Sequence, residues 1–175
     1  MPSLSKLVLL LAVISVAGCD LAADLDPKTE PTQIYMSEFQ GLDYRARPEL
    51  QRLRESLKSI KNSGNLDAMG QAMIDLGEKH RSLGERVLRL KAINVDADVV
   101  AYVEKFASRY REIGDLHTKA GQAAIDRDES TMNDLKPQLA QMQTWLNELQ
   151  SEREKLFETL STRYGGKEFN TVDYH

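Results

Sequence analysis

The chain has 175 residues and carries 23 lysines and arginines against 27 aspartates and glutamates, a net charge of −4. This length suffices for one domain, and the mildly acidic balance argues against a nucleic-acid-binding protein, which would need a strongly basic face. Aromatic residues make up only 6% of the chain, and β-branched residues do not alternate with polar ones in any segment. The composition and the periodicity therefore predict an all-α protein.

The first 19 residues have the layout of a secretory signal. Lys6 supplies a positive charge, the segment 7–16 is apolar apart from Ser15, and small residues lead to Cys19, the only cysteine. Ten apolar residues rise about 15 Å as a helix, which is half the hydrocarbon thickness of a bilayer. The segment is therefore too short to be read as a membrane span.

The sequence Val16-Ala17-Gly18-Cys19 resembles the lipobox of bacterial lipoprotein signals. The resemblance implies that residues 1–18 are a signal peptide and that Cys19 becomes the lipidated first residue of the mature protein. Its acyl chains would hold the protein on a membrane. An uncleaved anchor and ordinary cleavage are the alternatives. Removal of residues 1–18 leaves 22 basic and 27 acidic residues, a net charge of −5. No cofactor is expected beyond this covalent lipid.

Asp20 follows the lipidated cysteine directly. In lipoproteins of the enterobacterial type, an aspartate at this place resembles a sorting signal that keeps the protein in the inner membrane, facing the periplasm. A Gram-positive source would instead imply a location outside the cell. Residues 19–32 are polar, contain two prolines and show no apolar period, so they predict a tether in the cell envelope.

Beyond the tether, apolar residues recur at spacings of three and four through four long segments, which predicts four helices. They extend over about 33–61, 66–92, 96–126 and 131–163, with Asn65 as the expected N-cap of the second helix and Asp96 or Asn94 as that of the third. Pro48 predicts a kink or break in the first helix, and Pro137 predicts a kinked or separate start of the fourth. Gly165 and Gly166 end the last helix and leave a short, frayed tail over 165–175.

Short connections between long helices predict an elongated up-down-up-down bundle, or antiparallel coiled-coil hairpins, over residues 33–164. The second helix carries a glycine at every seventh position, which indicates close approach of a neighbouring backbone. These glycines are Gly70, Gly77 and Gly84. The last turns of the third helix are lined by small residues, which allow either tight or loose packing. They are Ala120, Gly121, Ala123 and Ala124.

Two histidines lie on the apolar seams of the second and third helices. If these helices pair about a turn near position 93.5, His80 lies opposite Ala107 and His117 lies opposite Gly70. The two rings are then about 15 Å apart along the bundle. Because the nitrogen ligands of a zinc ion lie about 2 Å from the metal, we expect structural, hydrogen-bonded histidines and no metal site.

The sequence contains none of the common catalytic motifs that we considered. There is no Gly-x-Ser-x-Gly, no Glu-x-x-His and no glycine-rich phosphate loop, so the chain is expected not to be an enzyme. The span from Asn65 onward is similar in length and rhythm to the cytochrome b562 bundle, which implies a non-covalent haem held by a methionine and a histidine. Met36 matches the methionine, but residues 157–164 contain no histidine.

Four basic residues follow one stripe of the first helix and give a possible contact with an anionic surface. They are Arg47, Arg54, Lys58 and Lys61. Anionic headgroups attract such residues by about 1 kcal/mol per charge. The alternative is a solvated face balanced by acidic neighbours. Arg153 lies on the apolar seam of the last helix. Three roles are open for it: its charged end can snorkel to the solvent, it can pair with a carboxylate, or it can mark an open groove.

These observations favour a non-enzymatic, lipid-anchored binding or scaffolding protein of the cell envelope, with a protein partner on its long faces. Two alternatives stay open. One is a carrier of a small ligand, haem or lipid, held between loosely packed helices near the small residues of the third helix. The other is an envelope structural protein that associates with itself through the glycine face of the second helix.

Overall fold

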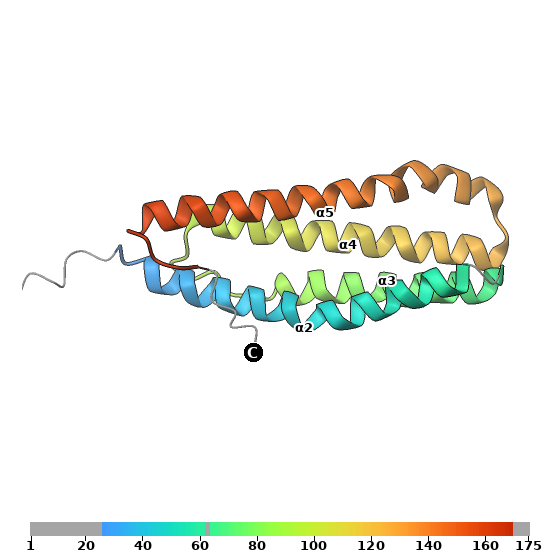
Figure 1. Ribbon diagram of the computed structural model, residues 1–175, viewed down its shortest axis with the longest axis horizontal. Helices are drawn as coiled ribbons and strands as arrows, with labels where there is room; N and C mark the ends of the chain where they lie inside the picture. Colours follow the sequence, from blue (N-terminus) through green and yellow to red (C-terminus); the bar gives the residue numbers. More distant parts are fainter. Residues whose placement is uncertain (1–25, 62–63, 170–175) are drawn as a thin grey trace, which may run out of the picture.

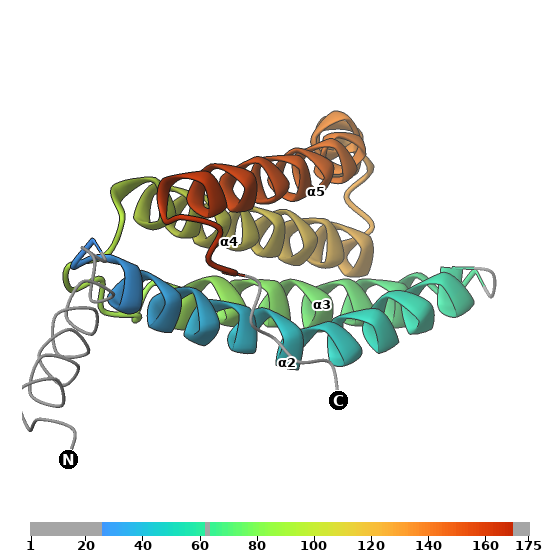
Figure 2. The ribbon, with the colours of Figure 1, turned by 60° about the vertical axis from the view of Figure 1, so that its left-hand side comes forward.

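The computed structural model describes residues 26–61 and 64–169, which form four long helices (Figure 1). The helices are α2 (Thr29–Lys61), α3 (Leu66–Val87), α4 (Ala97–Asp126) and α5 (Glu129–Arg163). They run up and down in chain order and form one elongated bundle, and the part of the chain that is described contains no strand (Figures 1 and 2). The predicted all-α four-helix architecture is confirmed.

The ends of two helices differ from those expected from the apolar spacing. α2 begins at Thr29, so the last four residues of the expected tether are helical. α3 ends at Val87 instead of near Ala92, and residues 88–96 form an irregular connection to α4. Leu90 nevertheless packs against the core, which explains why the apolar spacing continues past the end of the helix.

A polar residue directly before the first residue of α3, α4 and α5 caps the N-terminus of each of these helices. Each of these side chains accepts a hydrogen bond from a backbone N–H two or three residues further on, which satisfies a donor that the helix leaves unpaired. The capping residues are Asn65, Asp96 and Asp128. The sequence predicted the cap at Asn65, and of its two candidates for the cap of α4, Asp96 and Asn94, Asp96 is the one found.

The closest packing in the bundle joins α3 to α4 through their glycines. In each contacting pair, a Cβ atom added to the glycine of α3 would lie 2.6 Å from the carbonyl oxygen opposite. The pairs are Gly70 with Gly121, Gly77 with Gly114, and Gly84 with Ala107. The predicted close approach of a neighbouring backbone is confirmed.

This packing also corrects two roles considered for the small residues. α4 covers the glycine face of α3, so that face does not present itself to a second copy of the chain. The small residues near the end of α4 are buried, and Gly121 lies in the same close contact. They serve tight helix packing instead of leaving room for a ligand.

Of the remaining two helices, α2 packs mainly against α3, and α5 packs against α4. Phe39 of α2 meets the rings of Tyr102 and Phe106 of α4 edge-on, with centroids 5.9 and 4.9 Å apart. Leu149 and Leu160 of α5 are buried in the same core. No Cα atom of α2 lies within 8 Å of one of α5, so these two helices leave a gap over part of their length.

Both interior prolines are accommodated without a break in the helix. α2 is continuous through Pro48, so the break considered there does not occur, and α5 is continuous through Pro137. The first turns of α5 lie out of line with the rest of the helix in Figures 1 and 2. A bend of this kind is expected where a proline removes a backbone hydrogen bond.

A polar network around Asp96 closes the end of the bundle where α2 begins. Its backbone N–H donates to Thr32 Oγ1 at 3.0 Å, and its carboxylate accepts from the Arg163 guanidinium and, at 2.8 Å, from the Tyr164 hydroxyl. Burial alone would raise the pKa of Asp96, but the hydrogen bonds from Arg163 and Tyr164 lower it overall. The network therefore ties α2, α4 and α5 together.

The first part of the expected tail is packed instead of frayed. Gly165 and Gly166 adopt positive φ angles of 64° and 81° and turn the chain back. Phe169 is then only 3% exposed, and its carbonyl accepts a hydrogen bond of 2.9 Å from Gln40 Nε2 of α2. The rest of the tail, residues 170–175, lies outside the described residues.

Candidate functional site

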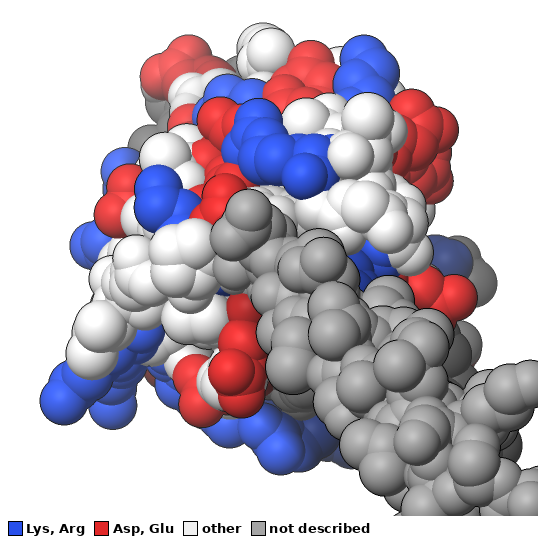
Figure 3. Space-filling view, turned by 90° about the vertical axis from the view of Figure 1, so that its left-hand side faces the viewer, with Lys and Arg blue, Asp and Glu red and all other residues white. Residues whose placement is uncertain are grey.

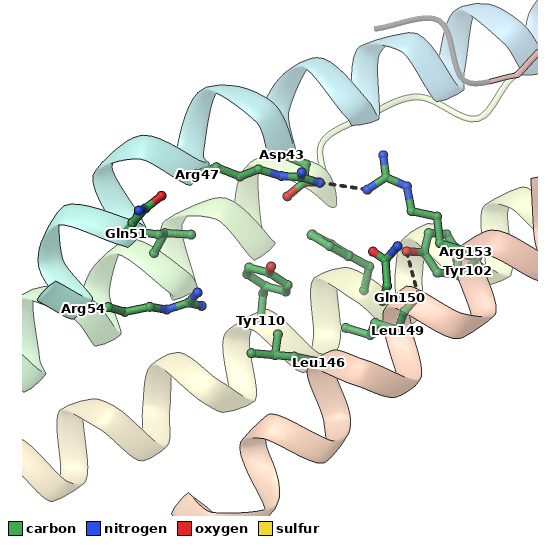
Figure 4. Close-up of a pocket in the computed structure, with 12 residues that line it drawn as sticks. Asp43, Arg47, Gln51, Arg54, Tyr102, Tyr110, Leu146, Leu149, Gln150 and Arg153 are labelled. Carbon is green, nitrogen blue, oxygen red and sulfur yellow. Dashed lines mark hydrogen bonds and ion pairs between the residues drawn. The ribbon is translucent and has the colours of Figure 1, made fainter. Parts of the chain in front are cut away.

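A cleft of about 370 Å³ opens between α2 and α5 over the middle of α4 (Figure 4). It occupies the gap that arises because the backbones of α2 and α5 do not approach each other closely. Side chains of all three helices face it. They are Asp43, Arg47, Leu50, Gln51 and Arg54 of α2, Tyr102, Phe106 and Tyr110 of α4, and Leu146, Leu149, Gln150 and Arg153 of α5. We call it the arginine cleft.

The arginine cleft contains three arginines and a single carboxylate. Asp43 Oδ2 accepts hydrogen bonds from Arg47 at 2.5 Å and from Arg153 at 3.1 Å. Arg153 is only 8% exposed, and its guanidinium lies 5.9 and 5.6 Å from the ring centroids of Phe39 and Phe157. One carboxylate cannot neutralise three guanidinium groups, so the lining carries a net charge of +2.

The floor of the arginine cleft is aromatic. The rings of Phe106 and Tyr110 stack with centroids 4.2 Å apart, and the Tyr102 hydroxyl donates to the Leu149 carbonyl at 3.3 Å. The Tyr110 hydroxyl points into the cleft (Figure 4). Burial raises the pKa of Tyr110 to about 12, so this hydroxyl stays protonated near neutral pH. The floor therefore offers ring faces next to hydrogen-bond donors.

Arg54 connects the wall of the cleft to a buried histidine. Its guanidinium Nη2 lies 3.2 Å from His80 Nε2, and His80 Nδ1 lies 2.8 Å from the Leu76 carbonyl oxygen. Because arginine only donates and a carbonyl only accepts, this geometry fits the neutral imidazole with its proton on Nδ1. Burial, His117 and Arg54 lower the pKa of His80 to about 3.

His80 stacks on His117, which corrects the expected separation of about 15 Å. The ring centroids are 5.3 Å apart and the ring planes differ by 6°. His117 Nδ1 lies 3.0 Å from the Ile113 carbonyl oxygen, and burial lowers the pKa of His117 as well. The predicted role as buried, hydrogen-bonded structural histidines is confirmed, whereas the predicted distance was wrong.

The error came from the helix register and from the direction of the side chains. Gly77 lies opposite Gly114, so the pairing is centred at position 95.5 instead of 93.5. The shift follows from the early end of α3 at Val87 and the longer connection after it. In addition, helical side chains lean toward the N-terminus of their own helix. In an antiparallel pair, His80 and His117 therefore lean toward each other at the level of Gly77 and Gly114.

The basic stripe predicted on the first helix divides into two parts. Arg47 and Arg54 line the arginine cleft, whereas Lys58 and Lys61 are exposed outside it. For the two lysines, contact with an anionic surface stays a prediction.

Arg153 combines two of the outcomes considered for it, since it pairs with a carboxylate and lines an open cleft. Its partner Asp43 escaped the sequence analysis. The signal was present, because Asp43 lies four residues after Phe39 and three before Ala46, on the apolar seam of its helix. An acidic and a basic residue on the seams of two helices of one bundle point to a buried ion pair.

The arrangement offers little to a metal or a haem iron. Within residues 26–61 and 64–169, no group of three or more histidines, cysteines, aspartates or glutamates is placed to hold a metal ion. The lining of the arginine cleft includes no histidine, methionine or cysteine. Met36, the residue that matched the cytochrome b562 pattern, is fully buried in the core. Of the side chains that can ligate a haem iron, the lining therefore offers only Tyr102 and Tyr110.

The features assigned to a lipoprotein signal, residues 1–18, Cys19 and Asp20, lie outside the described residues. Among the helices that are described, none is long and apolar enough to cross a bilayer. Comparison of the chain with protein-family models, with curated proteins and with solved structures finds no match.

Proposed function

We propose that this protein is a non-enzymatic, lipid-anchored binding protein of the cell envelope that holds an anionic ligand with an apolar body in the arginine cleft. The observation that carries the proposal is the excess of arginine in an open cleft, with one arginine buried and two exposed. Arg153 is buried there beside Arg47 and Arg54, and Asp43 is the only acidic residue of the lining.

The chemistry of the cleft favours a ligand with one carboxylate or phosphate group. A guanidinium donates two parallel hydrogen bonds to such a group, and these bonds are stronger than those between neutral partners. A cleft of about 370 Å³ has the size of a small-molecule site. Its aromatic and leucine side chains, Phe106, Leu50 and Leu149 among them, would shield the apolar part of the ligand from water.

The same geometry supports a binding role without catalysis. Both ring nitrogens of His80 are engaged in hydrogen bonds, and its lowered pKa keeps it neutral. The raised pKa of Tyr110 makes it a poor base near neutral pH. The groups at the cleft can therefore donate hydrogen bonds and neutralise charge, but they are not arranged to accept a proton from a ligand.

The anchor in this proposal rests on the resemblance of residues 16–19 to a lipobox. It places the protein on a membrane facing the periplasm, with the inner membrane favoured by Asp20, or outside the cell in a Gram-positive source. A protein partner on the long faces stays a prediction from the sequence, and cross-linking in the native membrane followed by mass spectrometry tests it.

The test of the cleft uses residues 20–175 as a soluble chain and calorimetric titration with matched probes. Decanoate and decyl phosphate carry the anionic group, and decanol carries the same alkyl chain without it. The two anions are expected to bind and the alcohol to bind much more weakly, since it cannot use the arginines. Equal binding of acid and alcohol, or no binding of either anion, overturns the proposal.

A variant localises the binding to the arginine cleft. The double variant Arg47→Gln, Arg54→Gln removes two exposed cations of the lining and is expected to weaken decanoate binding at least about tenfold, because charge-assisted hydrogen bonds are lost. Arg52→Gln is the matched control, since Arg52 is an exposed arginine of the same helix that does not line the cleft. If both variants weaken binding equally, the ligand lies elsewhere.

A further inference from the structure

The end of the bundle where α2 begins exposes large apolar side chains. Ile93, in the connection between α3 and α4, is 74% exposed, and Ile34 of α2 is 55% exposed. Both line one open hollow of about 470 Å³ together with Pro31 and Val95. Figure 3 looks onto this end and shows uncharged surface between groups of cationic and anionic side chains. We call this hollow and its rim the Ile93 surface.

The Ile93 surface is held next to the point where the chain enters α2. Asn94 adopts a left-handed backbone conformation with a φ of 56°, and its side-chain amide donates to the Pro27 carbonyl at 3.1 Å. At the other end of the same connection, the backbone N–H of Asp96 donates to Thr32. The loop that carries Ile93 is therefore fixed to the first residues that precede and begin α2.

We propose that the Ile93 surface docks on a lipid bilayer with anionic headgroups and orients the bundle with this end toward the membrane. The inference rests on the lipid anchor at Cys19 for its proximity to a bilayer. Only six residues separate Cys19 from Asp26, the first described residue, and they span at most about 25 Å. The loop that carries Ile93 is bound to Pro27 through Asn94, so it is held near the tether.

The charges at the rim agree with an anionic bilayer. Arg89 and Lys91 line the hollow, against Glu38 as its only acidic lining residue. A bilayer suits this combination, because its negative headgroups attract the cations and its hydrocarbon layer accepts the exposed isoleucine. A purely aqueous role would leave Ile93, the most exposed of the large apolar side chains described, without a reason for its position.

This orientation differs from the one that the basic stripe of α2 would produce. Lys58 and Lys61 lie at the other end of α2, a helix of 33 residues and about 50 Å. A bundle held by those lysines would lie flat, with both of its ends near the headgroups. A bundle docked by the Ile93 surface stands with its far end, where Leu66 begins α3, away from the membrane (Figure 2).

The experiment places one fluorescent label at either end of the full, membrane-processed chain. Ile93→Cys is labelled with a polarity-sensitive fluorophore, and Leu66→Cys is the matched control, because Leu66 is an exposed leucine at the far end (44%). Each protein is reconstituted in vesicles of phosphatidylcholine with phosphatidylglycerol, and in phosphatidylcholine alone. A quencher attached to the lipid acyl chain reports insertion. Wild-type protein, treated in parallel, gives the background from Cys19.

The expected result is a blue-shifted, quenched signal at Ile93 and an unchanged aqueous signal at Leu66, with quenching reduced in the neutral vesicles. Arg89→Glu with Lys91→Glu is expected to reduce the quenching at Ile93, whereas Lys58→Glu with Lys61→Glu leaves it unchanged. Equal quenching at Ile93 and Leu66 means a flat orientation and overturns the proposal. An aqueous signal at both positions overturns it as well.

The anchor and the docking surface can fail separately in this experiment. Mass spectrometry of the peptide containing Cys19 shows whether it carries lipid. A lipidated Cys19 with an aqueous Ile93 rejects the docking surface and keeps the anchor. An unlipidated Cys19 with a quenched Ile93 keeps the docking surface and rejects the anchor. Neither result bears on the arginine cleft, which is tested on the soluble chain.

Discussion

Asp43 is the residue on which the arginine cleft depends, because it is buried and holds two guanidinium groups through one oxygen. Asp43→Asn leaves Arg153 buried with an uncompensated charge, and the free energy of unfolding is expected to fall by about 3 kcal/mol. Urea denaturation followed by circular dichroism measures this loss. The same experiment on Asp115→Asn, which breaks an exposed pair with Arg81, is expected to show less than about 1 kcal/mol. Similar losses in both variants would contradict a buried role for Asp43.

His80 makes the stability of the bundle depend on pH. Its pKa is about 3 in the folded protein because of burial, His117 and Arg54, whereas a histidine in the unfolded chain titrates near pH 6.5. As the pH falls below about 6.5, only the unfolded state takes up the proton. The contribution of neutral His80 is therefore complete above this pH and is lost progressively toward about pH 3.

The free energy of unfolding is thus expected to fall between pH 6 and 5 by up to about 1.4 kcal/mol per pH unit for each such histidine. His117, whose pKa is also lowered, adds to this slope. His80→Gln removes one titrating group and should reduce the slope measured by urea denaturation at pH 6.0, 5.5 and 5.0, a window above the titration of most carboxylates. An unchanged slope would show that His80 is not a buried neutral histidine.

For single helices, the apolar spacing and the capping residues predicted the structure well, whereas the connection between α3 and α4 was predicted poorly. The seams of α3 and α4, the caps at Asn65 and Asp96, and the close approach at Gly77 follow from local physics. The end of α3 at Val87 does not, because the polar network around Asp96 holds the following connection and that network uses residues from three helices. The misplaced histidine register followed from that one connection.

The glycines of α3 give the sharpest test of the packing between helices. An alanine Cβ at Gly77 would lie 2.5 Å from Thr118 Oγ1 and 2.6 Å from the Gly114 carbonyl oxygen, so α3 and α4 must separate. Gly77→Ala is expected to destabilise the protein by about 1 to 3 kcal/mol despite the better helix propensity of alanine. The measurement is the urea midpoint of the purified variant.

Gly41→Ala serves as the control for helix propensity. Gly41 lies within α2, and the nearest atom to an added Cβ, in the Arg45 side chain, is 3.7 Å away, an ordinary contact. This substitution is expected to stabilise the protein by up to about 1 kcal/mol, since alanine favours a helix over glycine. If Gly77→Ala stabilises to the same degree, α3 and α4 are not packed backbone to backbone.

For the whole molecule, the sequence predicted the number and order of the helices but not the gap between α2 and α5. The width of that gap depends on how two helices sit on the α3–α4 pair, which no local pattern encodes. Arg153 was the one indication, as a cation on a seam where leucines were expected. Its partner Asp43 lies 110 residues away in the chain, so the pair appears only when the helices are assembled.

The described part of the tail connects the two helices that the bundle leaves apart. Phe169 follows α5, packs in the core with its ring 5.4 Å from that of Tyr164, and accepts a hydrogen bond from Gln40 of α2 through its carbonyl. A second bond, from Gln33 to the Glu168 carbonyl at 3.0 Å, lies alongside. The tail is therefore a direct link between α2 and α5 at the closed end of the bundle.

Loss of this link should loosen the end of the bundle as well as weaken the core. Phe169→Ala is expected to lower the free energy of unfolding by about 3 kcal/mol, the usual cost of emptying a buried phenylalanine site. Ile93→Ala, at an exposed position, should change it by less than about 0.5 kcal/mol. Hydrogen exchange adds the spatial test, since Phe169→Ala should speed exchange most in the α2 turns around Gln40. Uniformly faster exchange along the chain would mean that Phe169 contributes to general stability but does not join α2 to α5.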